Sequence, residues 1–337
     1  MFKSIKYTFF LFFLCFKAVF PIDNTSQSLT IYTDYNSNIL LPIFHTFEEN
    51  TGTKIHLVYN SSIQRTHIIQ GIPNNHTPDI VITKDAKSLA LNADLLNKIP
   101  YGLIKKDSLH LTNEHKKLMR ISYDTQVLAY STERIKTSDL PKSALDLTNK
   151  KWKKKLSIAP NNISFQKFIN TMQQTSTDSI VPNFIDSLIA NETKKYQRDI
   201  DQIQAIENGE VDIALINSSS LVFFKKYHDK TTVSQTSFAA NDIGNVFCST
   251  VAGMVKSTPN KRIATKFLRF LLSNSVQQYI TTATGEYPVI KEIITDQKFN
   301  NQIYLNNIHS EYNQKLPYDI KAVRQLLINR SFIKNTG

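Results

Sequence analysis

Glycine is scarce in this chain, with only eight among 337 residues. They stand at positions 52, 71, 102, 209, 244, 253, 285 and 337. Both the dinucleotide fingerprint and the phosphate-binding loop need closely spaced glycines, and this spacing excludes both. A Gly-x-Ser-x-Gly nucleophile elbow is missing as well. The commonest sequence signals for nucleotide-dependent and serine-hydrolase activity are therefore absent.

Cysteine is scarcer still, because Cys15 lies near the N-terminus and Cys248 is alone in the rest of the chain. Cys248 belongs to the apolar-leaning run 246–253, which favours a buried, inert thiol over a nucleophile. The eight histidines are scattered, without a His-Glu-x-x-His motif or paired cysteines, so the sequence gives zinc no support. We predict that the protein is not an enzyme and has no cofactor, and we assign no metal ligands.

Acidic residues are outnumbered by basic ones, and the formal net charge is +12. A basic excess indicates nucleic-acid binding where Lys and Arg gather with several aromatic residues. The densest basic run, 150–155, holds a single aromatic residue, Trp152, and the other basic residues are spread along the chain. We predict a solvated basic surface and no nucleic-acid partner.

The N-terminus carries an unbroken apolar run at residues 7–16, preceded by Lys3 and Lys6. A run of this length is too short to span a bilayer but fits the core of a secretory signal peptide. We predict a signal peptide over residues 1–22 and export to the periplasm. Two alternatives stay open, namely lipid attachment at Cys15 and an uncleaved anchor.

The length of the chain exceeds what one hydrophobic core usually serves, so we expect two lobes. Strand patterns alternate with helical ones, which is typical of a parallel α/β sheet. We expect strands at residues 28–33, 55–59, 79–83, 125–130, 156–159, 211–216 and 251–255, with residues 232–238 returning to the first lobe. The predicted lobes are 23–120 plus 235–290 and 121–234, followed by a C-terminal helical wrap over 291–337.

Residues 205–220 combine a helix end, a short strand and three serines. Gly209 ends the helix because glycine adopts the left-handed backbone conformation at no steric cost. The apolar run 211–216 is typical of a parallel strand buried on both faces. In open α/β sheets the ligand crevice lies beyond the carboxyl ends of the strands, so the serines lie where a ligand would be held.

The same reasoning at the other strand ends and helix starts completes the set of candidate ligand-binding residues. These are Asp34, Tyr35, Asn36, Ser61, Ser62, Lys84, Asp124, Asn161, Ser164, Ser218, Ser219 and Ser220. Each has an alternative structural role, because strand ends and helix N-caps favour Ser, Asn and Asp in any protein.

Several segments together resemble the ferric-ion-binding proteins of bacterial ABC importers, within the type II periplasmic-binding superfamily. They are residues 29–33, 47–55, 59–62, 78–83, 139–143, 151–155, 158–160, 205–217, 253–257 and 285–288. These segments cover nearly the whole mature chain in the family's order. The resemblance implies an α/β, type II periplasmic-binding-protein-like fold, with two lobes around a central cleft joined by hinge strands. It also implies that Trp152 is a packing residue.

The chain departs from the family's pattern at the positions that bind iron. Where iron-binding members carry adjacent tyrosines, this chain has Ser219 and Ser220. The family's first-strand histidine falls near Asn36, an acid of some members falls at Lys84, and an anion-binding arginine of many members falls at Asp124. Fe³⁺ favours ionised oxygen donors, and a phenol with a pKa near ~10 ionises far more readily than a serine hydroxyl. We predict that the ferric site is lost.

The remaining hydroxyls and amides, with one cation, describe a site for a small polar or anionic organic solute. Substitute phenolates at Tyr35, Tyr59, Tyr123 and Tyr287 are an alternative that would keep iron as the ligand, although packing roles explain these tyrosines as well.

The sequence therefore predicts an exported solute-binding component of an ABC importer that closes over its ligand by a hinge motion. The expected partners are permease and ATPase subunits and a small-molecule or ion ligand, with Fe³⁺ as one candidate, and we expect a monomer. One alternative is a binding protein for a phosphonate, carboxylate, polyamine or thiamine-like solute. Another is a non-transport protein that kept the fold and lost the site.

Overall fold

The computed structural model of the chain describes residues 28–35, 37–59, 77–84, 86–103, 116–175, 179–240, 242–290, 292–293 and 319–334. The predicted signal peptide lies outside these residues, as do the candidates Asn36, Ser61 and Ser62. In the part of the chain that is described, no helix combines the length and the apolar character needed to cross a membrane.

The strands join into one sheet in the order β2–β1–β3–β9–β4–β7–β5–β6, with β8 and β10 also paired to β4. Their bounds are β1 Ser28–Thr33, β2 Lys54–Tyr59, β3 Ile80–Thr83, β4 Met119–Ser131, β5 Leu156–Ile158, β6 Lys194–Lys195, β7 Ile213–Asn217, β8 Val233–Thr236, β9 Phe247–Met254 and β10 Tyr287–Pro288. The pairs β1–β2, β1–β3, β5–β6 and β5–β7 are parallel, as the strand–helix alternation predicts.

Helices cover both halves of the sheet. The α-helices are α1 Ser37–Thr51, α3 Ala86–Leu91, α4 Ile163–Thr175, α5 Ile180–Ala190, α6 Asp199–Glu207, α7 Ser218–Tyr227, α8 Lys261–Leu271, α9 Asn274–Thr284 and α11 Ile320–Asn329. Short 3₁₀ helices occupy Ala93–Leu95, Tyr101–Leu103, Thr137–Asp139, Ala144–Thr148 and Lys150–Trp152.

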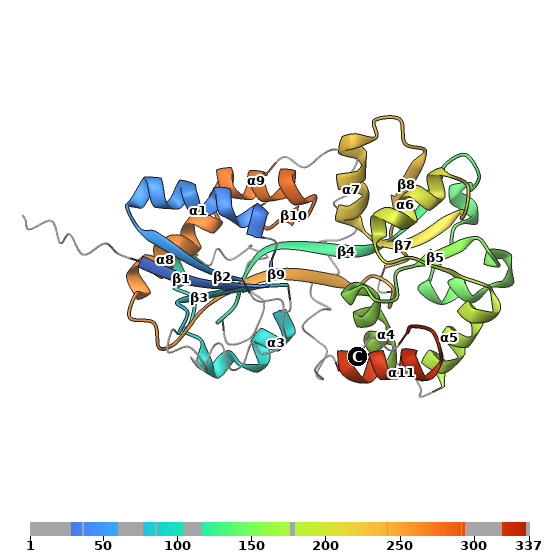
Figure 1. Cartoon of the computed structure of the whole chain (residues 1–337), viewed down its shortest axis with the longest axis horizontal. Helices are drawn as coiled ribbons and strands as arrows, with labels where there is room; N and C mark the ends of the chain where they lie inside the picture. Colours follow the sequence, from blue (N-terminus) through green and yellow to red (C-terminus); the bar gives the residue numbers. More distant parts are fainter. Residues whose placement is uncertain are drawn as a thin grey trace, which may run out of the picture.

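Two long antiparallel strands, β4 and β9, run between the two halves of the molecule (Figure 1). Residues 119–125 of β4 pair with β9, which in turn pairs with β3. Residues 126–131 of β4 pair with β7 and β8 instead. A single strand is therefore shared by both halves, so the lobes are joined through the sheet itself.

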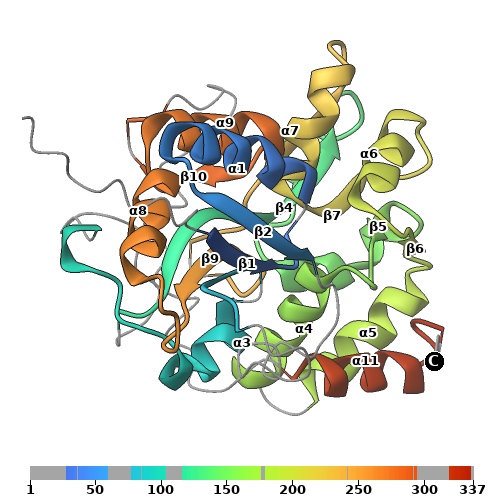
Figure 2. The ribbon, with the colours of Figure 1, turned by 60° about the vertical axis from the view of Figure 1, so that its left-hand side comes forward.

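Each half has its own hydrophobic core. The first-lobe core includes Leu29, Ile31, Phe44, Phe47, Ile80, Ile82 and Phe267, from β1, α1, β3 and α8. The second-lobe core includes Trp152, Leu156, Phe168, Phe184, Leu215, Val323 and Leu327, from the last 3₁₀ helix and from β5, α4, α5, β7 and α11. Figure 2 shows α11 lying along α4 and α5, so the described C-terminal helix belongs to the second lobe.

The structure agrees with the order of the predicted elements, and the differences lie at β4, β8 and β9. β9 begins at Phe247, four residues before the predicted start at 251. β4 begins at Met119, six residues before the predicted start, and carries Arg120, Ser122 and Asp124 in a strand that is buried throughout. The prediction that residues 232–238 return to the first lobe is wrong for β8, which pairs with β4 on the β7 half of the sheet. The chain returns through β9 instead. The exact lobe boundaries stay a prediction.

Candidate functional site

A cleft of about 640 Å³ opens between the two lobes. It is lined by Asp34, Tyr35, Ile39, Tyr59, Lys84, Ser219, Phe223, Ala283, Thr284 and Glu286. The first lobe contributes the carboxyl ends of β1, β2 and β3 and the turn between α9 and β10. The second lobe contributes the first two turns of α7, which faces that turn in Figure 1. We call this space the interlobe cleft.

The strongest electrostatic contact in the interlobe cleft joins Lys84 and Glu286. The Lys84 ammonium lies 2.5 Å from Glu286 Oε1, and the carboxylate also accepts hydrogen bonds from the hydroxyls of Ser122, at 2.5 Å, and Thr250, at 3.2 Å. Burial disfavours the charge of Glu286, but Lys84 and the hydroxyls more than offset this, and its pKa lies below the usual value. For Lys84, desolvation opposes the charge and Glu286 restores it, so its pKa is raised. Both groups stay ionised at neutral pH.

A second buried carboxylate, Asp124, lies on β4 and is held by the second lobe. It accepts hydrogen bonds from the hydroxyls of Ser218, at 2.8 Å, and Ser219, at 2.5 Å, and from the backbone N–H of Ser219 at 3.2 Å. Burial and then the nearby charge of Glu286 raise the pKa of Asp124 above its usual value. The serine hydroxyls predicted to hold a ligand therefore serve this carboxylate in the structure.

Asp34 and Tyr35 follow β1 on the opposite wall. Asp34 accepts hydrogen bonds from the Thr83 hydroxyl at 2.8 Å and the Lys84 backbone N–H at 3.2 Å, so it fixes the end of β3 against the end of β1. The Tyr35 hydroxyl is buried without a hydrogen-bond partner of normal geometry, and its ring lies 5.2 Å from the Lys84 ammonium. Burial and then the charge of Glu286 hold the pKa of Tyr35 well above its usual value.

Behind the cleft, three side chains of the second lobe and β9 lie together. The Ser164 hydroxyl is 3.4 Å from the Cys248 sulfur, and the buried Lys167 ammonium is 3.8 Å from it. Lys167 also reaches the backbone carbonyl of Lys84 at 3.4 Å, which links α4 to the end of β3. Cys248 is a buried thiol that forms no disulfide, as predicted. Ser164 is buried in this cluster and does not line the interlobe cleft.

Two sequence candidates point away from the cleft. Asn161 is exposed and donates to Gln197 at 3.4 Å. Ser220 donates to Asp199 at 3.1 Å, and Asp199 also accepts from the backbone and side chain of Asn217 at 2.8 Å. This cluster fastens the start of α7 to the start of α6. The position of a residue at the carboxyl end of a strand predicts that it lies at this edge of the sheet, but it does not predict where its side chain points.

Sequence reasoning missed Glu286, the acidic partner of Lys84. The segment 285–288 carries part of the family resemblance, yet only Tyr287 within it was considered as a ligand. The available sequence signal was Gly285. In the structure it has a φ of 75° and lies in the turn before the short strand β10, which pairs with β4. Phe223 and Thr284 were missed too, since neither stands at a strand end.

The donor set of the described residues is poor for a metal ion. No group of three or more His, Cys, Asp or Glu side chains in the described ranges is placed to hold one. The carboxylates at the interlobe cleft are already engaged, Glu286 with an ammonium, Asp124 with two hydroxyls and Asp34 with the Thr83 hydroxyl. Tyr35 is protonated in the metal-free protein, because burial and then the charge of Glu286 raise its pKa.

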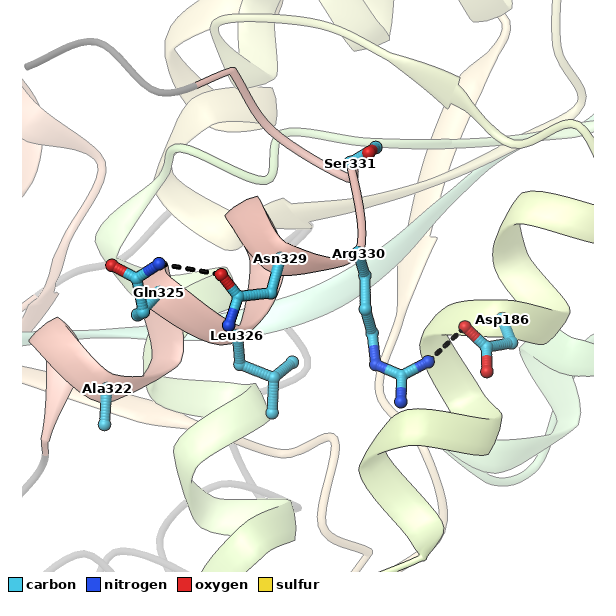
Figure 3. A pocket seen from close by; sticks show the side chains of 7 residues that line it. All are labelled: Asp186, Ala322, Gln325, Leu326, Asn329, Arg330 and Ser331. Atoms are coloured by element: carbon cyan, nitrogen blue, oxygen red, sulfur yellow. Dashed lines mark hydrogen bonds and ion pairs between the residues drawn. The ribbon is translucent and has the colours of Figure 1, made fainter.

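A larger hollow, about 830 Å³, lies at the C-terminal helix (Figure 3). Its lining is Asp186, Ala322, Gln325, Leu326, Asn329, Arg330 and Ser331. The polar groups there satisfy one another, with Arg330 paired to Asp186 at 2.5 Å and Gln325 donating to Asn329 at 2.7 Å. The interlobe cleft is smaller, but it gathers buried charged groups from both lobes, so we take it as the candidate site.

Comparisons with known proteins identify the family of this chain. A family model described as bacterial extracellular solute-binding protein matches residues 75–312. The major ferric iron-binding protein of Neisseria meningitidis serogroup A is 25% identical over 273 residues, covering 79% of this chain and 82% of that protein. Iron uptake protein A2 of Synechocystis is 24% identical and covers 80% of each chain.

Solved structures share the fold. Iron-bound HitA from Pseudomonas aeruginosa superposes with a TM-score of 0.72 at 24% identity, covering 90% of this chain and 99% of that one. The apo ferric ion-binding protein A of Pasteurella haemolytica gives a TM-score of 0.73 at 19% identity, covering 92% and 100%. The predicted two-lobed α/β fold and the predicted family are thereby confirmed.

Proposed function

Because this chain belongs to the bacterial extracellular solute-binding proteins, we propose that it captures a small solute in the interlobe cleft and delivers it to an ABC importer. The observation that carries the proposal is a cleft lined by polar and aromatic side chains from both lobes, across strands that the lobes share. A ligand that touches both walls favours the closed arrangement by the free energy of its contacts to the second wall.

The proposal includes the cellular setting. The protein is exported by residues 1–22 and acts in the periplasm as a monomer. Its partners are the permease, which receives the solute, and the ATPase subunits, which hydrolyse ATP. The chain itself catalyses no reaction. A relative from Serratia marcescens that is named as a periplasmic Fe(3+)-binding protein supports this setting.

The ligand that best fits the interlobe cleft is a small polar or anionic organic solute. The side chain of Lys84 is 47% exposed, whereas that of Glu286 is 2% exposed and Asp124 is buried. A ligand therefore meets an ammonium that retains N–H donors, together with the Asp34 carboxylate, which already accepts hydrogen bonds from Thr83 and the Lys84 backbone. Tyr59 and Phe223, both exposed, add aromatic surface on opposite walls.

Native mass spectrometry of the exported protein tests this proposal directly. We expect a retained solute whose mass is that of a small organic molecule, and its loss when Lys84 is replaced by alanine. Retention that is unchanged by Lys84→Ala and by a bulky Ser219→Trp substitution would move the ligand out of the interlobe cleft.

Ferric iron is the second candidate, because the relatives are named for ferric iron and Tyr35 has a buried hydroxyl without a hydrogen bond of normal geometry. Adding ferric citrate to metal-free protein and recording the visible spectrum decides between the two. A strong tyrosinate–iron charge-transfer band that disappears in Tyr35→Phe would establish iron. With the organic-solute proposal, we expect no such band.

A further inference from the structure

Two buried carboxylates at the interlobe cleft, Glu286 and Asp124, lie near a cation that the chain itself supplies, whereas the partly exposed Asp34 lines the cleft directly. The Glu286 side chain is 2% exposed and is in contact with the Lys84 ammonium, whose side chain is 47% exposed. This arrangement differs from an empty acidic pocket, in which carboxylates face the solvent and wait for an ion.

The Lys84 ammonium occupies the point where oxygen-bearing side chains converge. It lies 2.5 Å from Glu286 and 5.2 Å from the centre of the Tyr35 ring, and the charges of Glu286 and Asp124 both favour its protonated form. A carboxylate in contact with the ammonium, with a tyrosine and a second carboxylate in its neighbourhood, supplies the kind of oxygen donors that hard cations take.

A metal ion would have to compete for donors that are already engaged. One oxygen of Glu286 faces the ammonium, and the other accepts from Ser122 and Thr250. Asp124 is engaged by the second lobe in the same way. An incoming cation would also meet the positive charge of Lys84 at close range, where poor screening makes the repulsion strong.

We propose that Lys84 is a built-in cation that fills the cation position of the interlobe cleft and excludes metal ions from it. Lys84 is thus a specificity-determining residue, and it directs the cleft toward organic solutes with an anionic or polar group. This inference rests on the proposed function, because it assumes that the interlobe cleft is where the ligand binds.

Three substitutions at position 84 test the idea with terbium(III) as a hard, oxygen-seeking probe whose emission is sensitised by a nearby tyrosine such as Tyr35. Lys84→Gln removes the charge and keeps an N–H donor for Glu286. Lys84→Glu reverses the charge, and Lys84→Arg keeps it as the matched control. We expect terbium affinity to rise at least about tenfold in Lys84→Gln and further in Lys84→Glu, with Lys84→Arg like the wild type.

Adding Glu286→Gln to Lys84→Gln is expected to abolish the gain, which places the new site at Glu286. Thermal unfolding of each variant without metal serves as a control, because it shows whether the variant is folded when terbium is added. An equal affinity in the wild type and Lys84→Gln, or a gain in Lys84→Arg as large as in Lys84→Gln, would overturn the inference.

The two proposals can fail separately. If the wild type retains an organic solute by native mass spectrometry and Lys84→Gln gains no terbium affinity, the exclusion role of Lys84 fails and the binding function stands. If the variants gain terbium affinity as expected but no solute depends on the interlobe cleft, the exclusion role stands as a property of the site and the proposed ligand class fails.

Discussion

Each lobe holds one buried carboxylate at the interlobe cleft, and the pKa values of the two carboxylates shift in opposite directions. On the first-lobe wall, Glu286 has an ammonium partner as well as two hydroxyl donors, and its pKa is lowered. On the second-lobe side, Asp124 has hydroxyl and backbone donors but no ammonium in ion-pair contact among the described residues, and its pKa is raised. Both groups are almost completely buried.

The difference shows which interaction offsets desolvation. Hydrogen bonds from neutral donors reduce the cost of a buried charge, whereas a paired cation at 2.5 Å reverses the direction of the pKa shift. Glu286 therefore keeps its charge to a lower pH than Asp124 does. Each of the following substitutions changes the surroundings of one of these two carboxylates or shifts one lobe relative to the other.

Glu286→Gln gives the largest expected loss of stability, about 2 kcal/mol at pH 7, because it removes the charge partner of Lys84. The loss stays below that of a fully buried pair, since the half-exposed Lys84 can be solvated. Because the pKa of Glu286 is lower in the folded state, its contribution is present above the unfolded value and disappears as pH falls through the folded value. Urea unfolding at several pH values measures this.

The matched control is Glu210→Gln, at an exposed glutamate that pairs with Lys194 and Tyr196. It should leave the urea midpoint unchanged at neutral pH. A midpoint shift as large as that of Glu286→Gln would show that burial does not make the charge of Glu286 more important for stability than that of an exposed glutamate.

Gly285→Ala has the next largest expected effect. It should destabilise the arrangement in which the two lobes are in contact by about 1.5 kcal/mol. Gly285 has a φ of 75°, and an added Cβ would lie 2.9 Å from the Ser219 carbonyl and 3.0 Å from Val222. The substitution therefore pushes the first-lobe turn away from α7. Small-angle X-ray scattering should show a larger radius of gyration.

Gly209→Ala provides the control for backbone strain alone, because Gly209 has the same φ of 75° and an added Cβ meets nothing within 4 Å. It should lose stability without a change in radius of gyration. Equal radii for the two variants would mean that the contact between the turn and α7 does not hold the lobes together.

Ser219→Ala is expected to cost about 1 kcal/mol and to raise the pKa of Asp124 further, because the carboxylate loses its 2.5 Å hydroxyl donor. Ser220→Ala should cost less, since Asp199 keeps its donors from Asn217. Urea unfolding of the two variants at pH 7 compares them. A larger loss in Ser220→Ala would place the more important carboxylate at Asp199.

The sequence predicts those elements whose signal is local. β1 occupies the predicted residues, and the run that follows Gly209 forms β7. The start of β4 was missed because Arg120, Ser122 and Asp124 interrupt its apolar pattern, and those polar groups are satisfied only by partners from β9, α7 and the α9–β10 turn. The length of a shared strand is thus set by tertiary contacts.

The site is predicted in outline and not in its pairings. Asp34, Tyr35, Lys84 and Ser219 all line the interlobe cleft, because strand ends of a parallel sheet gather at one edge. The pairing of Lys84 with Glu286 joins residues far apart in the sequence, and no local pattern contains it. The same limit explains why the serines were assigned to a ligand when they serve Asp124 and Asp199.

Asp124→Asn is expected to have the smallest effect at pH 7, within about 1 kcal/mol of the wild type, because it removes a hydrogen-bonded charge together with the cost of burying it. The pH dependence of the stability difference between Asp124→Asn and the wild type is more informative than its size. The pKa of Asp124 is higher in the folded state, so ionisation lowers the stability of the wild type as pH rises from its unfolded value through the folded one. The variant lacks this penalty, and its stability relative to the wild type should improve between pH 4 and pH 7, opposite in sign to Glu286→Gln. Urea unfolding of both variants at the two pH values gives the comparison, and the same sign for both would mean that the two buried carboxylates share one environment.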